Sequence, residues 1–505
     1  MQEIYEIDTS NKKSAIPAED ILMGRKNFAD ANDNGMDSDV TILIQAYNRL
    51  EKTKECVSSV LKYTTDVNYD LLLVDNGSTD DTFEYFKAID YPKKRIIHIT
   101  KNVSAVYPNL CFDLSWIAKY YVCLANDIVV TPQWLSNMVK VAESDDRIGM
   151  VNPVGSNMSN LQQVNLQFNS LDEMEAEAGK FNVSDPTRWQ ERLRLITLGT
   201  LYKKECLYAI GWPISDVGFY HDFGDDDITF RVRRAGYKAI LAGDTWIHHN
   251  HDFIHSEDRD PEELNRSLKI GRQNFKDKYF GIDAWDDVNN FIPEYLNVLK
   301  PANSQTKSIL GVDVRCGTPI LEIKNRLRLY NIFDADCYAF TRLGKYFIDL
   351  QTVCGADRVH TGSIDRVKDC FEENSLDYIV IGEDINSYPE PLKLIQDAYR
   401  LLKSGGQLFV SLKNVYDIFT FLNIIGNGRN NNQPHVVNYS IEQFMNALLQ
   451  NGFNTQYITA RQYNLLPEAQ KYVNDCMSQL AGDGAQESAF RLMVDRYFFV
   501  INKPQ

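Results

Sequence analysis

The sequence has no CxxC pair, no long apolar run and no excess of positive charge, and each absence excludes a class of protein. Its nine cysteines are scattered singly along 505 residues, which is typical of reduced core thiols and not of a disulfide scaffold or a zinc knuckle. Nowhere do about 18 apolar residues run together, and the polar N-terminus lacks the apolar centre of a signal peptide, so we expect a cytoplasmic protein without a transmembrane segment. The net charge of −16 argues against extensive binding to nucleic acid or to an anionic membrane.

The chain holds enough apolar material for two or three domains, because 44% of its residues are hydrophobic and 11% are aromatic. Residues 1–37 are polar and form an N-terminal extension, which is either ordered or a tether. Strand patterns then alternate with helix patterns, which predicts an α/β domain with a parallel sheet over residues 38–300. A Pro/Ser/Asn linker around residues 297–308 precedes a second alternating pattern, so we place a second α/β domain at residues 301–505. The strands expected in the first domain cover residues 40–44, 71–74, 96–100 and 120–124.

Three of these strands end in polar residues. The segment YYVCLANDIVVTP runs as a buried strand into Asn126 and Asp127, and the segments TILIQAYNR and LLLVDNGSTDDT repeat the pattern. Strand tips in open α/β sheets face the crevice in which ligands bind, so we expect the three tips to converge on one site. Asp127 is the first candidate for a metal carboxylate.

Taken together, the motifs QAYNR, VDNGSTDDT, LANDIVVTPQWL and GDDDITFRVRRAGYK, followed by WIHH, resemble the family 2 glycosyltransferases, which have a GT-A fold. The resemblance covers roughly residues 38–280 and rests on several motifs in the right order. It implies an inverting, metal-dependent enzyme that moves a sugar from a nucleotide-diphosphate donor to a hydroxyl acceptor.

The resemblance assigns a divalent cation, Mn²⁺ or Mg²⁺, to the leaving diphosphate, whose charge such a cation neutralises as a Lewis acid. Asp127 matches the last position of the family's Asp-x-Asp motif, whereas Ala125 stands at its first position, and Asn126 could help. His248 matches the histidine that completes the metal shell in the family. No HExxH motif supports a zinc site, so the other histidines of HHNHDFIH are interpreted as loop residues: His249, His251 and His255.

The resemblance also assigns contacts with the nucleotide. Asp75 matches the family's acid that contacts the base or the ribose, Tyr47 could stack on the base, and Ala46 could offer backbone groups. The alternative is that Asp75, Asn76 and Gly77 only make a turn, which Asn and Gly do readily.

The acidic triplet before the helix pattern TFRVRRAGYK contains the candidate general base. In the resemblance, Asp225 takes the place of the residue that removes the proton of the acceptor hydroxyl, with Asp226 as the reserve because the register is uncertain by one residue. An inverting transfer needs one such base opposite the leaving diphosphate. The alternative is that these acids only stabilise the helix dipole, which could explain one or two of them.

The second domain resembles a class I S-adenosylmethionine-dependent methyltransferase, with ILGVDVRCGTPIL as its first strand and nucleotide loop. Arg315 and Pro319 replace two glycines that let the backbone approach the cofactor in that family. We therefore expect a degenerate Rossmann-like domain that does not bind S-adenosylmethionine and instead binds the acceptor, mediates homo-oligomerisation or positions the first domain. The alternative is a bifunctional glycosyltransferase and methyltransferase, with Asp313 and Glu383 as the first cofactor ligands.

The leading hypothesis is a transferase that uses a UDP-linked sugar, with UDP-N-acetylglucosamine as the first guess. Acceptors of the family include surface glycans and, in some bacterial operons, Ser or Thr hydroxyls of surface proteins, and the expected lack of a transmembrane segment favours a protein. The rival hypothesis is a non-catalytic scaffold, which is suggested by Ala125, by Gly224 in place of the acidic residue that usually precedes the base, and by the altered cofactor loop.

Overall fold

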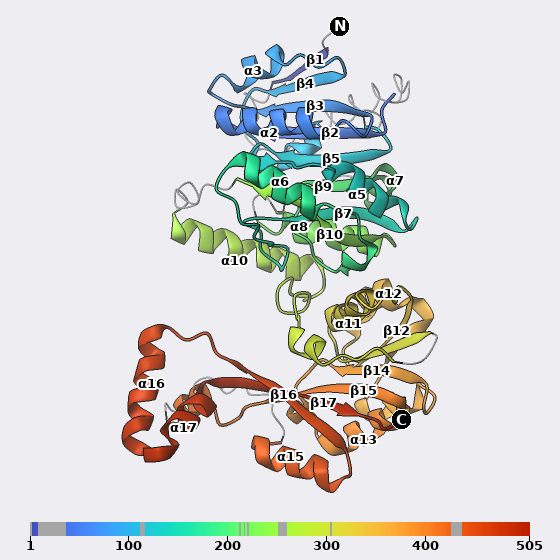
Figure 1. Cartoon of the computed structure of the whole chain (residues 1–505), viewed down its shortest axis with the longest axis vertical. Coiled ribbons are helices and arrows are strands. Elements are labelled where there is room, and N and C mark those ends of the chain that lie inside the picture. Colours follow the sequence, from blue (N-terminus) through green and yellow to red (C-terminus); the bar gives the residue numbers. More distant parts are fainter. Residues whose placement is uncertain are drawn as a thin grey trace. The chain divides into compact units, whose positions relative to one another are not determined.

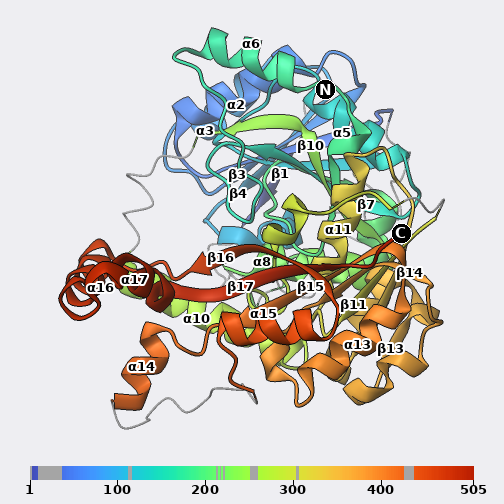
Figure 2. The same cartoon turned by 60° about the horizontal axis from the view of Figure 1, so that its bottom comes forward.

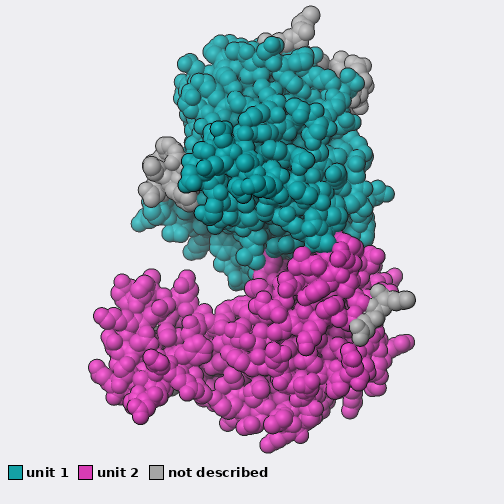
Figure 3. Space-filling view, viewed as in Figure 1, with its two compact units in different colours: residues 1–289 teal, residues 290–505 magenta. Residues whose placement is uncertain are grey.

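The computed structural model describes residues 3–8, 37–111, 117–211, 214–216, 218–219, 222–250, 260–302, 306–425 and 437–505. The chain forms two compact units, Met1–Asn289 and Asn290–Gln505, which we call the N-terminal and the C-terminal unit (Figure 3). The sequence analysis places the boundary at 300/301. The structure assigns the preceding residues to the second unit because Tyr295, in the short helix η4 (Pro293–Asn297), packs on Phe409 and Phe498.

The N-terminal unit is built on one ten-stranded sheet (Figure 1). Its first five strands are parallel, whereas β9 runs antiparallel to both of its neighbours, so the sheet is mixed and not wholly parallel as expected. The edge strand β1 comes from the N-terminal extension. The strand order is β1 (Glu3–Ile7), β4 (Lys94–Ile99), β3 (Tyr69–Asn76), β2 (Val40–Ala46), β5 (Tyr120–Ala125), β9 (Thr200–Lys203), β7 (Ile148–Gly155), β10 (Lys238–His249) and β6 (Ile128–Val129), with β8 (Trp189–Arg192) also paired to β10.

Helices cover both faces of this sheet, because successive side chains of a strand point to opposite sides. Ile42 and Ile44 of β2 pack into a core under α2, α3 and α5, whereas Leu43 packs into a second core under α6, α7 and α8. The helices of the unit are α2 (Leu50–Tyr63), α3 (Thr82–Ala88), η1 (Ser104–Val106), α4 (Pro108–Cys111), α5 (Trp134–Glu143), α6 (Leu171–Phe181), η3 (Pro186–Arg188), α7 (Lys204–Ile210), α8 (Gly224–Arg234) and α10 (Pro261–Lys278).

The C-terminal unit is a second α/β fold with a seven-stranded sheet. Five strands are parallel, and β17 runs antiparallel between β15 and β16. The order is β13 (Val359–Thr361), β12 (Ala335–Thr341), β11 (Lys307–Val312), β14 (Leu376–Ile381), β15 (Leu402–Lys413), β17 (Val494–Asn502) and β16 (Asn454–Gln462). The α/β class predicted from the sequence is therefore confirmed for both units.

The helices α16 and α17 of this unit pack against each other beyond the ends of β16 and β17 (Figure 2). Within the described residues, no helix is both long and apolar enough to cross a membrane. The helices of the unit are η4, α11 (Thr318–Arg328), η5 (Gly344–Tyr346), α12 (Phe347–Cys354), η6 (Ala356–Arg358), η7 (Ile364–Asp369), η8 (Ile385–Ser387), α13 (Pro391–Leu401), α14 (Ile418–Ile425), α15 (Ile441–Gln450), α16 (Pro467–Leu480), η9 (Gly482–Gly484) and α17 (Ala485–Met493).

Candidate active site

The strand tips that the sequence singles out lie side by side at one edge of the N-terminal sheet. Ala46 of β2 is in register with Asp75 of β3, which is in register with His98 of β4. On the other side of β2, Gln45 is in register with Ala125 at the end of β5. The loops after β2, β3 and β5 therefore start from neighbouring positions.

Hydrogen bonds hold these loops together. The backbone N–H of Asn48 donates to Ser78 Oγ at 2.9 Å, and Thr79 N–H donates to Asn48 Oδ1 at 2.8 Å. Asn126 is buried, and its side-chain amide donates to the Asn48 carbonyl and to Thr53 Oγ1, both at 2.9 Å. Asn126, predicted as a helper at the metal, thus uses its amide group to tie the tip of β5 to the loop after β2 and to α2.

Gly77 brings the loop after β3 against the loop after β4. Its φ of +79° lies in the region that favours glycine. A Cβ atom there would stand 2.3 Å from the backbone nitrogen of Asn102. Only a residue without a side chain fits this contact.

Asp127 lies in the turn between β5 and β6, and its two carboxylate oxygens differ in surroundings. Oδ1 is buried and has no hydrogen-bond partner among the residues that the structure describes. Oδ2 lies 3.6 Å from His249 Nε2 and 3.8 Å from Arg49 Nη1. Burial by itself raises the pKa of Asp127, but His249 and Arg49 outweigh it and hold the pKa below its ordinary value. The same pairing raises the pKa of His249 against the effect of its own burial.

The histidine beside Asp127 is His249 and not His248, which the sequence analysis predicts. The two residues are consecutive in β10, so their side chains point to opposite faces. His248 Nδ1 lies 2.8 Å from Ser156 Oγ, and its ring packs against Trp246 and Phe168. Burial lowers the pKa of His248. His251 and His255 lie outside the described residues.

Asp127 and His249 fit a hard divalent cation. In the parts of the chain that the structure describes, no three His, Cys, Asp or Glu side chains form a ready-made cage. Mg²⁺ and similar ions, however, are commonly held by one or two carboxylates together with substrate phosphates and water. The buried Oδ1 of Asp127, to which no described residue donates a hydrogen bond, offers one such ligand.

The residues predicted to contact a nucleotide differ in solvent exposure. Tyr47 is 42% exposed just beyond β2, whereas Ala46 is buried. The Asp75 side chain is fully buried, and both of its oxygens have partners: Oδ1 accepts the Ser78 N–H at 2.9 Å, and Oδ2 lies 2.7 Å from His98 Nδ1. Asp75 therefore orients His98, which sequence reasoning missed and whose ring stacks on Phe83 at 4.1 Å.

The predicted general base lies in the first turn of α8. Asp225 accepts a hydrogen bond from Thr197 Oγ1. Burial raises the pKa of Asp225, and the Thr197 hydrogen bond and the charge of Arg194 offset only part of the rise. Asp226, the reserve, forms an ion pair with Arg194. Asp225 is thus the acid of the two that has no direct cationic partner among the described residues.

Asp227, the third member of the triplet, is structural. Its Oδ2 accepts from Arg231 Nε at 2.9 Å, and its Oδ1 accepts from Tyr279 Oη at 2.6 Å. Lys278 pairs with the same Oδ1. Asp227 therefore fastens α8 to the end of α10.

Thr197 belongs to the segment before β9, which leads to the sheet edge where Asp127 lies. The Thr197 hydroxyl donates to Asp225 and so links that residue to the same edge. A Cβ atom on Gly199 would meet the side chains of Ile247, Leu124 and Pro153, which come from β10, β5 and β7. The segment therefore passes across the carboxyl ends of these strands.

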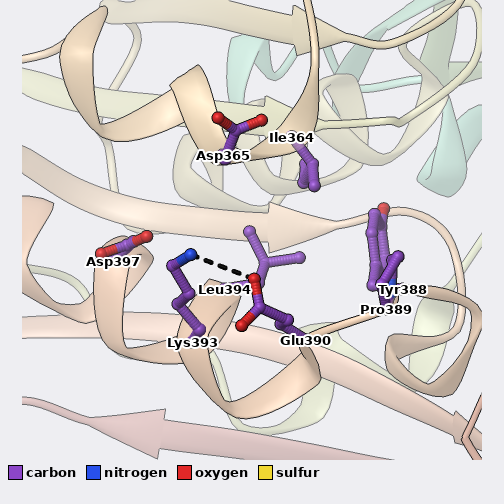
Figure 4. A pocket seen from close by; sticks show the side chains of 8 residues that line it. All are labelled: Ile364, Asp365, Tyr388, Pro389, Glu390, Lys393, Leu394 and Asp397. Carbon is purple, nitrogen blue, oxygen red and sulfur yellow. Dashed lines mark hydrogen bonds and ion pairs between the residues drawn. The ribbon is translucent and has the colours of Figure 1, made fainter.

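In the C-terminal unit, Asp313 and Glu383 follow β11 and β14, and each pairs with an arginine. Arg342 pairs with Asp313 at 2.5 Å, and Arg315 pairs with Glu383 at 3.0 Å. A pocket of about 310 Å³ lies elsewhere in this unit, beside η7 and α13, and Figure 4 shows Lys393 paired with Glu390 in it. It contains none of the predicted site residues. Its lining is Ile364, Asp365, Tyr388, Pro389, Glu390, Lys393, Leu394 and Asp397.

Residues 41–203 match the profile of the family described as glycosyl transferase family 2. An uncharacterized glycosyltransferase of Haemophilus influenzae is 27% identical over 115 residues, which are 22% of this chain and 34% of that protein. The uncharacterized protein y4gI of Sinorhizobium fredii is 26% identical over 244 residues, or 45% of this chain and 26% of that protein. The chain thus spans about a third or less of the length of these relatives.

Solved structures resemble parts of the chain. GalNAc-T7 with UDP, GalNAc and Mn²⁺ has a TM-score of 0.34 and 12% identity, covering 41% of this chain and 43% of that chain. S. aureus TarS 1–349 has a TM-score of 0.32 and 12% identity, with coverage of 47% and 65%. A SAM-dependent methyltransferase from Archaeoglobus fulgidus has a TM-score of 0.30 and 14% identity, with coverage of 45% and 98%.

Proposed function

Because residues 41–203 form a family 2 glycosyltransferase domain, we propose that the protein transfers a sugar from a nucleotide-diphosphate donor to a hydroxyl group, in one displacement with inversion. One observation carries the proposal. Among the described residues, Asp127 Oδ1 is a buried carboxylate oxygen without a hydrogen-bond partner, and Asp225, in the first turn of α8, is a carboxylate whose pKa is raised by burial. Thr197, which donates to Asp225, belongs to the segment that crosses the carboxyl ends of β5, β7 and β10.

Tyr47 and His98 hold the nucleotide in this proposal. The exposed ring of Tyr47 offers a face on which a base can stack. The carboxylate of Asp75 holds His98 Nδ1, which fixes the ring's orientation. Gly77 keeps the loop after β3, the strand that carries Asp75, in contact with the loop after β4, the strand that carries His98.

Asp127 and His249 would hold a divalent cation, Mn²⁺ or Mg²⁺, which would supply positive charge to the leaving diphosphate. Arg49, which is 38% exposed and lies 3.8 Å from Asp127, adds a second positive charge at the same place.

Asp225 removes the proton from the acceptor hydroxyl as that oxygen attacks the anomeric carbon. A carboxylate whose pKa is raised by burial is a stronger base than an ordinary one. The hydroxyl of Thr197 fixes its orientation. Asp226 neutralises Arg194 and keeps it from pairing fully with the base.

We take UDP-N-acetylglucosamine as the first donor to test and a Ser or Thr hydroxyl of a surface protein, or a surface glycan, as the acceptor. The test is nucleotide release from a panel of nucleotide sugars with Mn²⁺, followed by mass spectrometry of candidate acceptors. The variant Asp225→Asn should lose about 100-fold or more in kcat while UDP affinity, measured by calorimetry, stays within a few-fold.

Asp216→Asn is the matched control, because it makes the same chemical change in a half-exposed ion pair with Lys278. It should leave both readings unchanged. A fully active Asp225→Asn variant would refute the base assignment. Failure of the wild-type protein to bind any nucleotide in the presence of metal would favour a scaffold.

A further inference from the structure

The C-terminal unit has a crevice where a cofactor would be expected. From β11 the chain adds β12 and β13 on one side of the sheet, and then β14 and β15 on the other side. Open α/β sheets bind ligands outside the carboxyl ends of the two strands at which the order changes sides, here β11 and β14. The loops concerned are residues 313–317 after β11 and residues 382–386 after β14. The likeness of the sequence to methyltransferases would place S-adenosylmethionine between them.

The backbones of these two loops touch. A Cβ atom built on Gly382 would stand 2.6 Å from the carbonyl oxygen of Asp313 and 2.7 Å from Val314 Cα. The residue before Asp313 also accepts a hydrogen bond from Gly382 N–H at 2.9 Å. The two loops are therefore in direct backbone contact at Gly382.

Both carboxylate oxygens of Asp313 accept hydrogen bonds from the protein. Its Oδ1 accepts the Arg342 N–H at 2.8 Å, and its Oδ2 accepts Arg342 Nε at 2.5 Å and Tyr388 Oη at 2.9 Å. The guanidinium of Arg342 also lies over the Tyr388 ring at 4.4 Å. These contacts join the loop after β12 to the loop after β11.

Arg315 joins the loop after β11 to the loop after β14. Its Nε donates to Glu383 Oε1 at 3.0 Å. Pro319 is buried in the first turn of α11, where it removes an N–H that could face a ligand.

We propose that Asp313, Arg342, Tyr388, Arg315 and Glu383 form an ion-pair brace that closes the crevice, so that the C-terminal unit does not take S-adenosylmethionine. The two candidate acids for the cofactor are each neutralised by an arginine of the chain. The cofactor carries a sulfonium and an ammonium group, and neither acid can balance these charges without breaking an ion pair of the chain. The inference is independent of sugar transfer by the N-terminal unit.

The first test is binding to the full-length protein. Calorimetry and thermal unfolding are followed with S-adenosylmethionine and S-adenosylhomocysteine at millimolar concentration, with a methyltransferase of known affinity as the positive control. We expect no saturable heat and no rise in Tm. A saturable signal from either compound would overturn the proposal.

The second test asks whether the brace holds the unit together. Arg342→Ala leaves the Asp313 carboxylate, which is only 6% exposed, without its cation. The Tm of the C-terminal unit should fall by about 6 °C or more. Arg358→Ala is the matched control, since Arg358 pairs with the half-exposed Asp336 at 2.7 Å and lies over the Tyr338 ring.

The control should lower the Tm by about 2 °C at most. Equal shifts for the two variants would overturn the brace. If Arg342→Ala does not fold, Asp313→Asn against Asp336→Asn makes the same comparison, because each removes a charge and keeps the side-chain shape.

Discussion

Asp127 and His249 stabilise each other's charged forms, which makes the choice between His249 and His248 testable by substitution. His249 Nε2 faces Oδ2 of Asp127 at 3.6 Å, whereas His248 is held by Ser156 on the other side of the strand. Removal of a group that ligates or orients a metal ligand commonly costs 10–100-fold in metal affinity.

We therefore expect His249→Gln to raise the Mn²⁺ concentration for half-maximal nucleotide binding by about 10-fold or more. His248→Gln is the paired control and should raise it by less than about 3-fold, because its ring does not reach Asp127. Titration of Mn²⁺ at fixed UDP, read by calorimetry, measures both. A larger effect from His248 would restore the assignment made from the sequence.

The ionised Asp225 carboxylate that catalysis requires lowers the stability of the folded protein. Burial raises its pKa, so the ionised form that acts as the base is the less favourable form in the folded state. Below the unfolded pKa of about 3.9 the group is protonated in both states and destabilises nothing. Above the raised folded pKa the cost is present in full.

Asp225→Asn should therefore be inactive and yet more stable at pH 7, with a Tm higher by roughly 2–4 °C, the change that about 1 kcal/mol causes in a unit of this size. The gain should shrink as the pH falls towards about 4. Thermal unfolding of both proteins from pH 4 to pH 8 measures it. A variant less stable than wild type at pH 7 would contradict the burial argument.

At the scale of elements, strand tips decide which residues meet, and the sequence predicts the tips better than it predicts the faces. Apolar runs ending at Ala46, Asp75 and Ala125 are visible in the sequence, and the structure has them as adjacent strands. The face of a strand changes with each residue, so a motif match that is correct to one position cannot distinguish His248 from His249. The reversed direction of β9 depends on pairing with both β5 and β7, which no local pattern encodes.

The contact between the loops after β3 and β4 at Gly77 can be tested by a single substitution. Gly77→Ala should destabilise the protein by about 3 kcal/mol or more, because it adds a clash with the backbone of Asn102 to the cost of an unfavourable φ. Gly236→Ala is the control, since Gly236 has a φ of +92° but nothing within 4 Å of a built Cβ atom. It should cost only about 1–2 kcal/mol.

Urea unfolding measures the two free energies. The same Gly77 variant should also weaken UDP binding, because the loops that follow β3 and β4 move apart just beyond Asp75 and His98. Equal losses of unfolding free energy in the two variants would contradict the prediction, because they would show that the loop after β4 moves to make room for the added methyl group.

At the scale of the whole molecule, the chain joins two α/β units, each with its own sheet and core. The sequence predicts both folds because each depends on a regular alternation of strands and helices. It places the boundary at a Pro/Ser/Asn linker, whereas the structure places it before Tyr295, whose packing on Phe409 and Phe498 leaves no local mark in the sequence. The sequence likewise indicates only part of the brace around Asp313. Arg315 stands in the altered cofactor loop, but Arg342 comes from the loop after β12, which no motif marks.

Because each unit has its own core, we expect two thermal transitions in calorimetry of the full-length protein, and ligands should move only one of them. UDP with Mn²⁺ at about 100 times its dissociation constant adds about 2.7 kcal/mol to the unit that binds it, which is a rise of roughly 5–10 °C. S-adenosylmethionine should move neither transition. The Arg342→Ala variant identifies the transition of the C-terminal unit by lowering it, and UDP with Mn²⁺ should then raise the other one. A rise in the transition that Arg342→Ala lowers would assign nucleotide binding to the C-terminal unit and would refute the division of roles proposed here.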